Sequence, residues 1–339
     1  MYYFCTLFDK NYLYRGLTLY YSLLKHCPDF KLWILCMDDT TYQILGKMKL
    51  EKIILIALTE IEDQELLAIK KTRSPREYCW TLSPSLPSYV FNHNPEISSL
   101  AYIDSDLFFY TDPKPLYDEL GDGSVLIMEH KLPEGKKEKE SDVGKYNVGM
   151  MLFNNNTEGR KCLEWWRQKC NEWCYYRVEP NRFADQKYLD YFEENFQGVI
   201  ISKNNGADLS YWNMKNYRGK IKTSGHKILI DGHELIFFHY SCMDFYYPLS
   251  KLLPRGPLDA YTPPAEEKRL IYNIYIKAIY SSIKKILAVD HNFRSGLIAR
   301  PNIFAQIKDI SWPIFSEAAK SGLGPLRPFL SKIKKSINK

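Results

Sequence analysis

The chain has 339 residues, of which 45% are hydrophobic and 15% aromatic, so it can bury a large core and does not have a disordered composition. Its net charge of +6 is unevenly distributed: residues 268–339 carry fourteen Lys and Arg against three Asp and Glu, so the rest of the chain is acidic. An acidic region repels nucleic acid, which argues against a nucleic-acid-binding function. There is no apolar run of spanning length, no secretory signal pattern and no CxxC pair among eight cysteines, so we expect a cytoplasmic protein with free thiols.

Hydrophobic segments alternate with helical patterns over the first third of the chain. Strands are predicted at Tyr2–Phe8, Lys31–Met37, Glu51–Ala57 and Leu100–Ile103, and helices at Tyr12–His26, Glu62–Lys71 and Ser83–Asn92, with a charged loop at residues 70–78. This order predicts an α/β protein with a mostly parallel sheet, whose ligands lie at the carboxyl ends of the strands. Asp9, Asp38, Asp39, Asp104 and Asp106 all fall at such ends.

The sequence Asp104-Ser105-Asp106 lies between a buried strand and an aromatic segment. Two hard oxygen donors at this spacing suit a divalent cation, which in turn suits a diphosphate. An Asp-x-Asp pattern arises about once by chance in a chain of this length, so a surface turn is the alternative.

The later segments mix strands and helices. Strands are predicted at Ser124–Glu129, Tyr146–Phe153, Gly198–Ser202, Lys227–Ile230 and Leu235–His239, and helices at Thr157–Tyr175 and residues 185–192. The charged loop at residues 131–145 is either solvated or a lid over the substrate.

The last part of the chain has a different character. A Pro-rich linker begins near Arg255, Glu266–Val289 has apolar residues at helical spacing beside lysines, and residues 327–339 alternate apolar and basic residues. We therefore divide the chain into a domain at 1–250 and a basic amphipathic helical extension at 251–339. Such an extension is typical of binding to an anionic membrane surface, here the inner face of the cytoplasmic membrane. The alternative is a helix that covers the core with its lysines in water.

Six segments carry a resemblance to a known family. FCTLFDKNYLYRGLTLYYSL, CWTLSPSLP, YIDSDLFF, KYNVGMMLF, FADQKYL and LIFFHYS occur in the order found in GT-A glycosyltransferases. They most resemble family eight and related bacterial nucleotide-diphospho-sugar transferases. The resemblance covers residues 1–245 and implies a GT-A fold, a Rossmann-like mostly parallel sheet flanked by helices.

The resemblance also implies roles for individual residues. Asp104 and Asp106 would hold Mn²⁺ or Mg²⁺ on the diphosphate, with His239 as third ligand; an imidazole ligand favours Mn²⁺. The residues implied in nucleotide binding are Thr6, Leu7, Phe8, Asp9, Tyr12, Asp38, Asp39 and Ser105. Those implied at the phosphate or donor sugar are Arg73 or Arg76, Asn147, Asp185 and Gln186. The alternatives are a strand-end His239 bonded to backbone, a solvated basic loop for the arginines, and a helix N-cap for Asp185.

One departure from the family pattern follows His239. Family eight typically has a Gly and a Lys–Pro pair after this histidine, the lysine binding diphosphate, whereas here YSCMDFYYP follows and the next lysine is Lys251. This departure leaves both stereochemical outcomes of sugar transfer, retention and inversion, open. We prefer retention, and in an inverting enzyme Asp185 would be the base.

The expected function is sugar transfer from a nucleotide-diphosphate donor, UDP-sugar first, to a hydroxyl of a glycan or lipid-linked acceptor. Bacterial surface polysaccharide or lipopolysaccharide assembly is the expected setting. The alternatives are a toxin-type glucosyltransferase that modifies proteins and a catalytically inactive scaffold of the same fold that docks on membranes. An aspartyl-phosphate phosphatase fits less well, because Phe108 stands where such enzymes typically have Thr.

Overall fold

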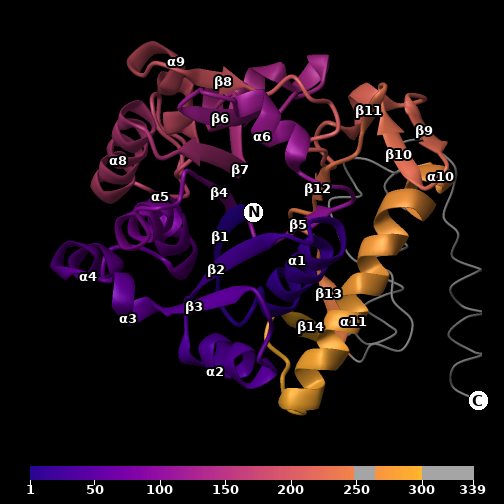
Figure 1. The fold of residues 1–339 in the computed structure, drawn as a ribbon, viewed down its shortest axis with the longest axis horizontal. Helices are drawn as coiled ribbons and strands as arrows, with labels where there is room; N and C mark the ends of the chain where they lie inside the picture. The colour runs from indigo at the N-terminus through magenta and orange to yellow at the C-terminus, as the bar shows by residue number, and fades with distance from the viewer. Residues whose placement is uncertain (248–263, 300–339) are drawn as a thin grey trace, which may run out of the picture. The chain divides into compact units, whose positions relative to one another are not determined.

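The computed structural model describes residues 1–247 and 264–299. A seven-stranded sheet in the order β3-β2-β1-β4-β7-β6-β8 forms its centre (Figure 1). The first four strands in that order are parallel, β7 runs antiparallel to β4 and β6, and β6 is parallel to β8. The strands are β1 (Tyr2–Phe8), β2 (Phe30–Cys36), β3 (Ile53–Ala57), β4 (Ser99–Ile103), β6 (Val125–Glu129), β7 (Tyr146–Asn154) and β8 (Val199–Ile201). The predicted mostly parallel sheet is confirmed.

Helices cover both faces of this sheet because its strands alternate apolar side chains between the faces. On one face, Cys5 and Leu7 of β1 belong to a buried cluster with residues of α5 (Pro75–His93) and α8 (Thr157–Glu172). On the other face, Phe4 packs edge-on against Phe30, next to α1 (Leu13–His26). Gly16 allows α1 to approach closely, since a Cβ there would overlap the Phe8 ring.

One predicted helix begins earlier than expected. The helix predicted at Ser83–Asn92 is α5, which starts at Pro75 inside the predicted charged loop. Ser74 is the N-cap of α5, because its hydroxyl accepts a hydrogen bond from Glu77 N. The Glu77 carboxylate in turn accepts a hydrogen bond from Ser74 N at 2.8 Å. The remaining short helices are α2 (Asp39–Met48), α3 (Leu58–Ile61), α4 (Gln64–Lys70), α6 (Lys114–Leu120), α7 (Glu140–Val143) and α9 (Phe192–Asn195).

Smaller sheets complete the fold. β5 (Leu107–Phe109) pairs antiparallel with β12 (Phe237–His239), so that His239 lies opposite Leu107. β9 (Ile221–Ser224), β10 (Lys227–Ile230) and β11 (His233–Glu234) form a three-stranded sheet, and β13 (Phe245–Tyr247) pairs with β14 (Leu297–Ala299).

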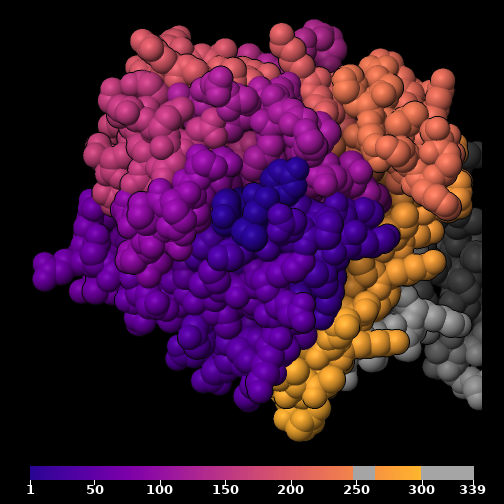
Figure 2. Space-filling view, viewed as in Figure 1, coloured from indigo at the N-terminus to yellow at the C-terminus, as the bar shows by residue number. Residues whose placement is uncertain are grey.

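The helix predicted at Glu266–Val289 lies along α1 (Figures 1 and 2). It comprises α10 (Ala265–Glu267), a π-helical turn (Lys268–Tyr272) and α11 (Asn273–Val289). Ser282 Oγ of α11 lies 2.7 Å from Thr18 Oγ1 of α1, within hydrogen-bond distance, and the buried residues of α11 include Tyr275, Ile279, Ile283 and Ile286. Its lysines at 277, 284 and 285 are exposed.

Residues 264–297 therefore belong to one compact unit with residues 1–245. The apolar face of α11 is covered by protein, as in the alternative that the sequence left open. The predicted boundary at residue 250 and the basic segment at 327–339 lie outside the described residues. Among the helices of the described ranges, none has both the length and the apolar character needed to cross a membrane.

Candidate functional site

Asp104, Asp106 and His239 meet at the carboxyl end of β4. The two aspartates belong to the turn between β4 and β5, and the pairing of β5 with β12 brings His239 beside that turn. The turn is held from two sides: Asp104 N donates to Gly149 O in β7 at 2.8 Å, and Tyr240 N donates to Asp106 O at 3.0 Å. Backbone hydrogen bonds thus hold the segments that carry the three side chains next to one another.

The three side chains are close enough to share a cation. One possible ligand atom from each lies within 4.8 Å of the other two. His239 Nε2 is 3.1 Å from Asp106 Oδ1 and 3.7 Å from Asp104 Oδ2. Asp106 and His239 are buried, whereas 33% of the Asp104 side chain is exposed, so the group is open to solvent at Asp104. Two carboxylates and an imidazole fit a divalent cation such as Mn²⁺.

The protonation of this group is coupled through burial and charge. Burial raises the pKa of Asp104 to about 7; His239 opposes this shift and Asp106 adds to it. Burial would also raise the pKa of Asp106, but the charge and hydrogen bond of His239 hold it below its usual value, with help from Arg15. Burial would lower the pKa of His239, yet Asp106 raises it well above its usual value. A bound cation would take over the charge that His239 now supplies.

The His239 ring lies against β7 at Gly149. A Cβ on residue 149 would lie 2.7 Å from His239 Nδ1 and 2.5 Å from Asn147 Oδ1. Asn147 Oδ1 accepts from Gly149 N at 2.8 Å. Asn147 Nδ2, which can only donate, lies 3.2 Å from His130 Nε2, so this ring nitrogen carries no proton and His130 is neutral. Trp212 packs edge-on against the His239 ring, with centroids 5.2 Å apart. Asn147 therefore supports the backbone next to His239, and its expected role at the sugar stays a prediction.

Asp185 lies near Asp104 at the end of a short polar chain. Tyr102 OH lies 3.1 Å from Ser83 Oγ and 3.1 Å from Asp104 Oδ1; because a carboxylate only accepts, the tyrosine donates to Asp104. Burial, with the charge of Asp104, raises the pKa of Asp185 to about 7, and hydrogen bonding with Ser83 opposes the shift. The Asp185 carbonyl accepts from Trp166 Nε1 at 2.8 Å. The structure thus places Asp185 near Asp104, in the candidate metal-binding group of Asp104, Asp106 and His239, called the metal group below.

The residues predicted at the nucleotide lie at the same edge of the sheet. Asp38 caps α2 by accepting from Thr41 N at 2.8 Å, and it accepts from Lys10 N, next to Asp9, at 2.7 Å. A cavity of about 290 Å³ opens at the carboxyl ends of β2 and β3. Its lining includes Met37, Asp38, Asp39, Tyr42, Leu58 and Lys70.

The other predicted nucleotide residues differ in accessibility. Thr6, Leu7 and Phe8 are buried in β1, and Thr6 Oγ1 has no hydrogen-bond partner within the described ranges. Tyr12 is 40% exposed, and the buried Arg15 places its guanidinium 4.3 Å from the ring centroid of Tyr12. Thus Tyr12 can contact a ligand from solvent, and Thr6 cannot without a local shift.

The predicted phosphate and sugar residues lie at several places. Arg73 donates to Asn171 O at 3.0 Å and lies over the Tyr175 ring, at the carboxyl end of α8. Arg76 is exposed on α5, and Gln186 donates to Val143 O at 2.7 Å. Ser105 is buried between the two aspartates. No contact among those described joins Arg73 or Arg76 to the metal group, and their phosphate role stays a prediction.

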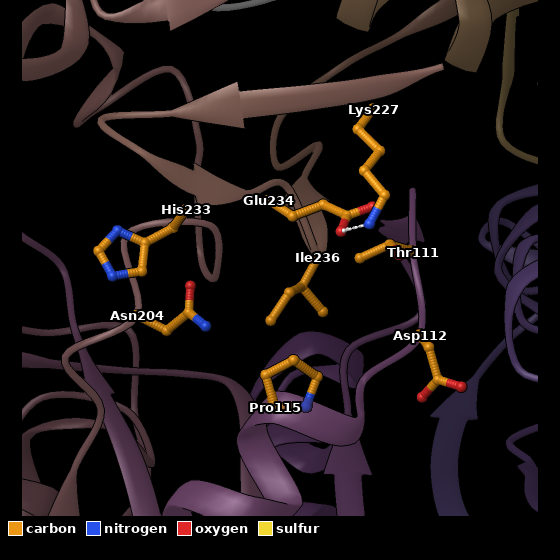
Figure 3. A pocket seen from close by; sticks show the side chains of 8 residues that line it. All are labelled: Thr111, Asp112, Pro115, Asn204, Lys227, His233, Glu234 and Ile236. Atoms are coloured by element: carbon orange, nitrogen blue, oxygen red, sulfur yellow. Dashed lines mark hydrogen bonds and ion pairs between the residues drawn. The ribbon is translucent and has the colours of Figure 1, made fainter. Parts of the chain in front are cut away.

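A second cavity of about 290 Å³ lies elsewhere (Figure 3). It is lined by residues that include Thr111, Asp112 and Ile236, beside a Lys227–Glu234 ion pair of 2.6 Å. Ile236 precedes β12, whereas His239 ends it, so roughly 10 Å of strand separates this cavity from the metal group. It provides a place for control substitutions.

Sequence reasoning did not identify Ser83, Tyr102, Arg15 or Asp208. Ser83 and Tyr102 fall within segments that carried the family resemblance, so their proximity to Asp104 and Asp185 could have been considered. Asp208 is buried with Oδ1 3.6 Å from His239 Nδ1, and nothing in its local sequence pattern signals this contact.

Comparisons with known proteins agree with this fold. No protein-family model matches the chain. The chain is 37% identical over 244 residues to the uncharacterized protein YfnF of Bacillus subtilis (strain 168), covering 70% of this chain and 80% of YfnF. It is 32% identical over 242 residues to YfnD of the same strain, covering 71% of this chain and 77% of YfnD.

Among solved structures, the galactosyltransferase LgtC, crystallised with donor and acceptor sugar analogs, aligns with a TM-score of 0.50 and 15% identity. The alignment covers 82% of this chain and 95% of LgtC, and it shows the fold alone. The chain thus has the GT-A fold of glycosyltransferases, and it belongs to the family of Bacillus subtilis YfnF and YfnD.

Proposed function

We propose that this protein is a metal-dependent glycosyltransferase that moves a sugar from a nucleoside-diphosphate donor to an acceptor hydroxyl. The observation that carries the proposal is the Asp104–Asp106–His239 group at the carboxyl end of β4, within a GT-A fold. Ligands of open α/β sheets bind at the carboxyl ends of the strands. The complex of LgtC with donor and acceptor sugar analogs supports the same reaction class.

Asp104, Asp106 and His239 would hold Mn²⁺ or Mg²⁺. A cation bound there supplies Lewis-acid neutralisation of the charge that develops on a departing diphosphate. Asp104, the most exposed of the three ligands, faces the incoming donor. The buried Asp106 and His239 hold the cation from the protein side. Arg15 adds a buried positive charge that acts on Asp106.

For the donor, we propose a UDP-sugar whose base and ribose occupy the cavity beside Asp38 and Asp39. Asp185 and Gln186 would line the donor sugar, since Asp185 lies near Asp104. We propose retention of configuration. In an inverting reaction Asp185 would have to reach the acceptor hydroxyl as base.

For the acceptor, we propose a glycan or a lipid-linked glycan of a bacterial surface polysaccharide or lipopolysaccharide at the cytoplasmic membrane. Residues 300–339, which lie outside the described ranges, carry eight Lys and Arg against two Asp and Glu. Because the apolar face of α11 is covered by α1, we assign the membrane binding to this segment. Removing residues 300–339 should then release the protein from anionic vesicles but not change its binding of nucleotide. Vesicle binding that persists would contradict this part of the proposal.

Two other functions for this fold make different predictions. An inactive scaffold should bind neither Mn²⁺ nor nucleotide, and a protein-modifying glucosyltransferase should transfer sugar to protein and not to glycan or lipid. The closeness of Asp104 and Asp106 speaks against the scaffold, since two neighbouring carboxylates without a cation are costly.

The test is a thermal-shift panel of UDP, GDP, CDP and dTDP, each with and without Mn²⁺. A ligand at a hundred times its dissociation constant adds about 2.7 kcal/mol to the free energy of unfolding, which raises the melting temperature measurably. We expect one nucleotide, UDP first, to give a metal-dependent shift in the wild type that Asp106→Ala abolishes.

A matched control is Asp112→Asn, in the cavity of Figure 3, which should keep the shift. Its Oδ1 accepts from Lys114 N at 2.8 Å, and an asparagine can accept the same hydrogen bond. No shift with any nucleotide in the wild type would contradict the proposed function.

A further inference from the structure

Asp208 is a buried carboxylate whose charge no hydrogen bond satisfies. The residue is 2% exposed, and neither carboxylate oxygen has a hydrogen-bond partner within the described residues. Its φ of +54° lies in the left-handed region, which is uncommon for residues other than glycine. Burying a carboxylate without hydrogen bonds destabilises the folded protein, so such a group calls for a functional explanation.

The position of Asp208 relative to His239 supplies that explanation. Asp208 Oδ1 lies 3.6 Å from His239 Nδ1, whereas the other ring nitrogen, Nε2, lies 3.1 Å from Asp106 Oδ1. The two nitrogens of one imidazole therefore face two different carboxylates. His239 Nδ1 also lacks a hydrogen-bond partner within the part of the chain that the structure describes.

The segment that carries Asp208 is fixed to the strand that carries His239. His239 N donates to Leu209 O at 2.7 Å, and Ser210 Oγ donates to His239 O at 2.7 Å. Asn213 then closes the turn: its Nδ2 donates to Asp208 O at 2.8 Å, and its Oδ1 accepts from Ser210 N at 2.9 Å. These hydrogen bonds hold the Asp208 backbone alongside β12.

Lys131 is another charged neighbour of Asp208, but it is engaged elsewhere. Burial lowers the pKa of Lys131, and the charge of Asp208 opposes that shift. Lys131 Nζ bonds to Asn205 Oδ1 at 3.2 Å and to Asn204 O at 3.4 Å. Lys131 therefore reduces the electrostatic cost of Asp208 without forming a hydrogen bond to it.

We infer that Asp208 is a positioning residue for the metal ligand His239, accepting a hydrogen bond from Nδ1–H so that the Nε2 lone pair faces the cation. The inference rests on the proposed function, because it needs a cation at the Asp104–Asp106–His239 group. Metal-bound histidines commonly donate their second N–H to a carboxylate, which fixes the tautomer and strengthens the ligand. A contact slightly beyond hydrogen-bond distance is usual before the ligand binds.

The test compares metal affinity with metal-free stability in the full-length protein. Free Mn²⁺ is followed by electron paramagnetic resonance during titration, and melting temperatures are measured in EDTA. Asp208→Asn keeps an acceptor and suits a positive φ, and Asp208→Ala removes the acceptor. We expect the Mn²⁺ dissociation constant to rise about tenfold in Asp208→Asn and by up to about a hundredfold in Asp208→Ala. Asp208→Asn should melt close to the wild type without metal, because asparagine keeps an acceptor toward His239 Nδ1 while the buried charge and its ion pair with His239 are lost together.

The outcomes separate this inference from the proposed function. If the wild type binds no Mn²⁺, the proposed function fails and this inference fails with it. If the wild type binds Mn²⁺ and Asp208→Asn binds it equally well, only the inference is overturned. A weaker affinity in Asp208→Asn with a lowered metal-free melting temperature would also overturn it, since that result shows a structural role. Asp112→Asn should match the wild type in both measurements.

Discussion

Asp185 is the residue whose ionisation most directly links stability to pH at this site. It is 4% exposed, and burial, with the charge of Asp104, raises its pKa from the ordinary 3.8 to about 7. The folded protein therefore keeps a proton on Asp185 at pH values where the unfolded chain has lost it. The contribution of Asp185 to the free energy of unfolding should fall as pH rises from about 4 to 7 and level off above that range.

Replacing Asp185 with asparagine removes this pH dependence. The free energy of unfolding of Asp185→Asn minus that of the wild type should rise by about 2–4 kcal/mol between pH 4 and 8, measured by urea denaturation in EDTA. The exposed Asp122→Asn serves as control and should give a flat difference. A flat difference for Asp185→Asn as well would show that the carboxylate ionises normally in the folded protein.

Gly149 leaves room for the His239 ring on β7. In Gly149→Ala the new methyl group would lie 2.7 Å from His239 Nδ1, so the ring must move. We expect about a tenfold or greater loss of Mn²⁺ affinity and a destabilisation of about 1–3 kcal/mol. Calorimetric titration and thermal unfolding measure the two effects.

The control for this substitution is Gly46→Ala in α2, where a Cβ would meet nothing within 4 Å. It should stabilise the protein by up to about 1 kcal/mol, because alanine favours helix more than glycine does. Unchanged metal affinity in Gly149→Ala would mean that the position of His239 does not matter for the cation.

Sequence reasoning reached part of this residue set. Asp104, Asp106 and His239 were found because each lies in a segment with a recognisable pattern, and the structure brings them together. Asp208 was not found because residues 203–226 were assigned no element, and its contact with His239 depends on how that segment folds back along β12.

At the scale of elements, α11 is part of the folded unit. Ile283 is fully buried in this helix, whereas Ile274 is 39% exposed. Ile283→Ala should lower the free energy of unfolding by about 2–5 kcal/mol, and Ile274→Ala, its matched control, by less than about 1 kcal/mol. Equal, small effects in chemical denaturation would mean that α11 does not pack on α1 in solution.

The start of α5 shows how a local signal can be overlooked. The segment Ser74-Pro75-Arg76-Glu77 has the capping-box spacing, with proline at the first helical position. Pro84 and Pro87 lie inside the helix, and prolines ordinarily interrupt one. The prediction began the helix at Ser83, directly before these prolines, and missed the start signal that lies upstream.

For the whole molecule, the alternation of strands and helices was enough to predict the sheet. Parallel neighbours β3, β2, β1 and β4 place the residues after each strand at one edge, which is where Asp9, Asp38 and Asp104 lie. The packing of α11 could not be predicted, because a basic amphipathic pattern is the same whether the apolar face meets protein or lipid.

Anomalous diffraction at the manganese absorption edge, from crystals grown with Mn²⁺ and UDP, would locate the cation and the donor diphosphate together. We expect one strong peak within bonding distance of Asp104, Asp106 and His239, with the diphosphate on the Asp104 side. Asp106→Ala crystals grown in the same way should lose the peak. Bound UDP with no manganese at this group, or with manganese elsewhere, would contradict the account.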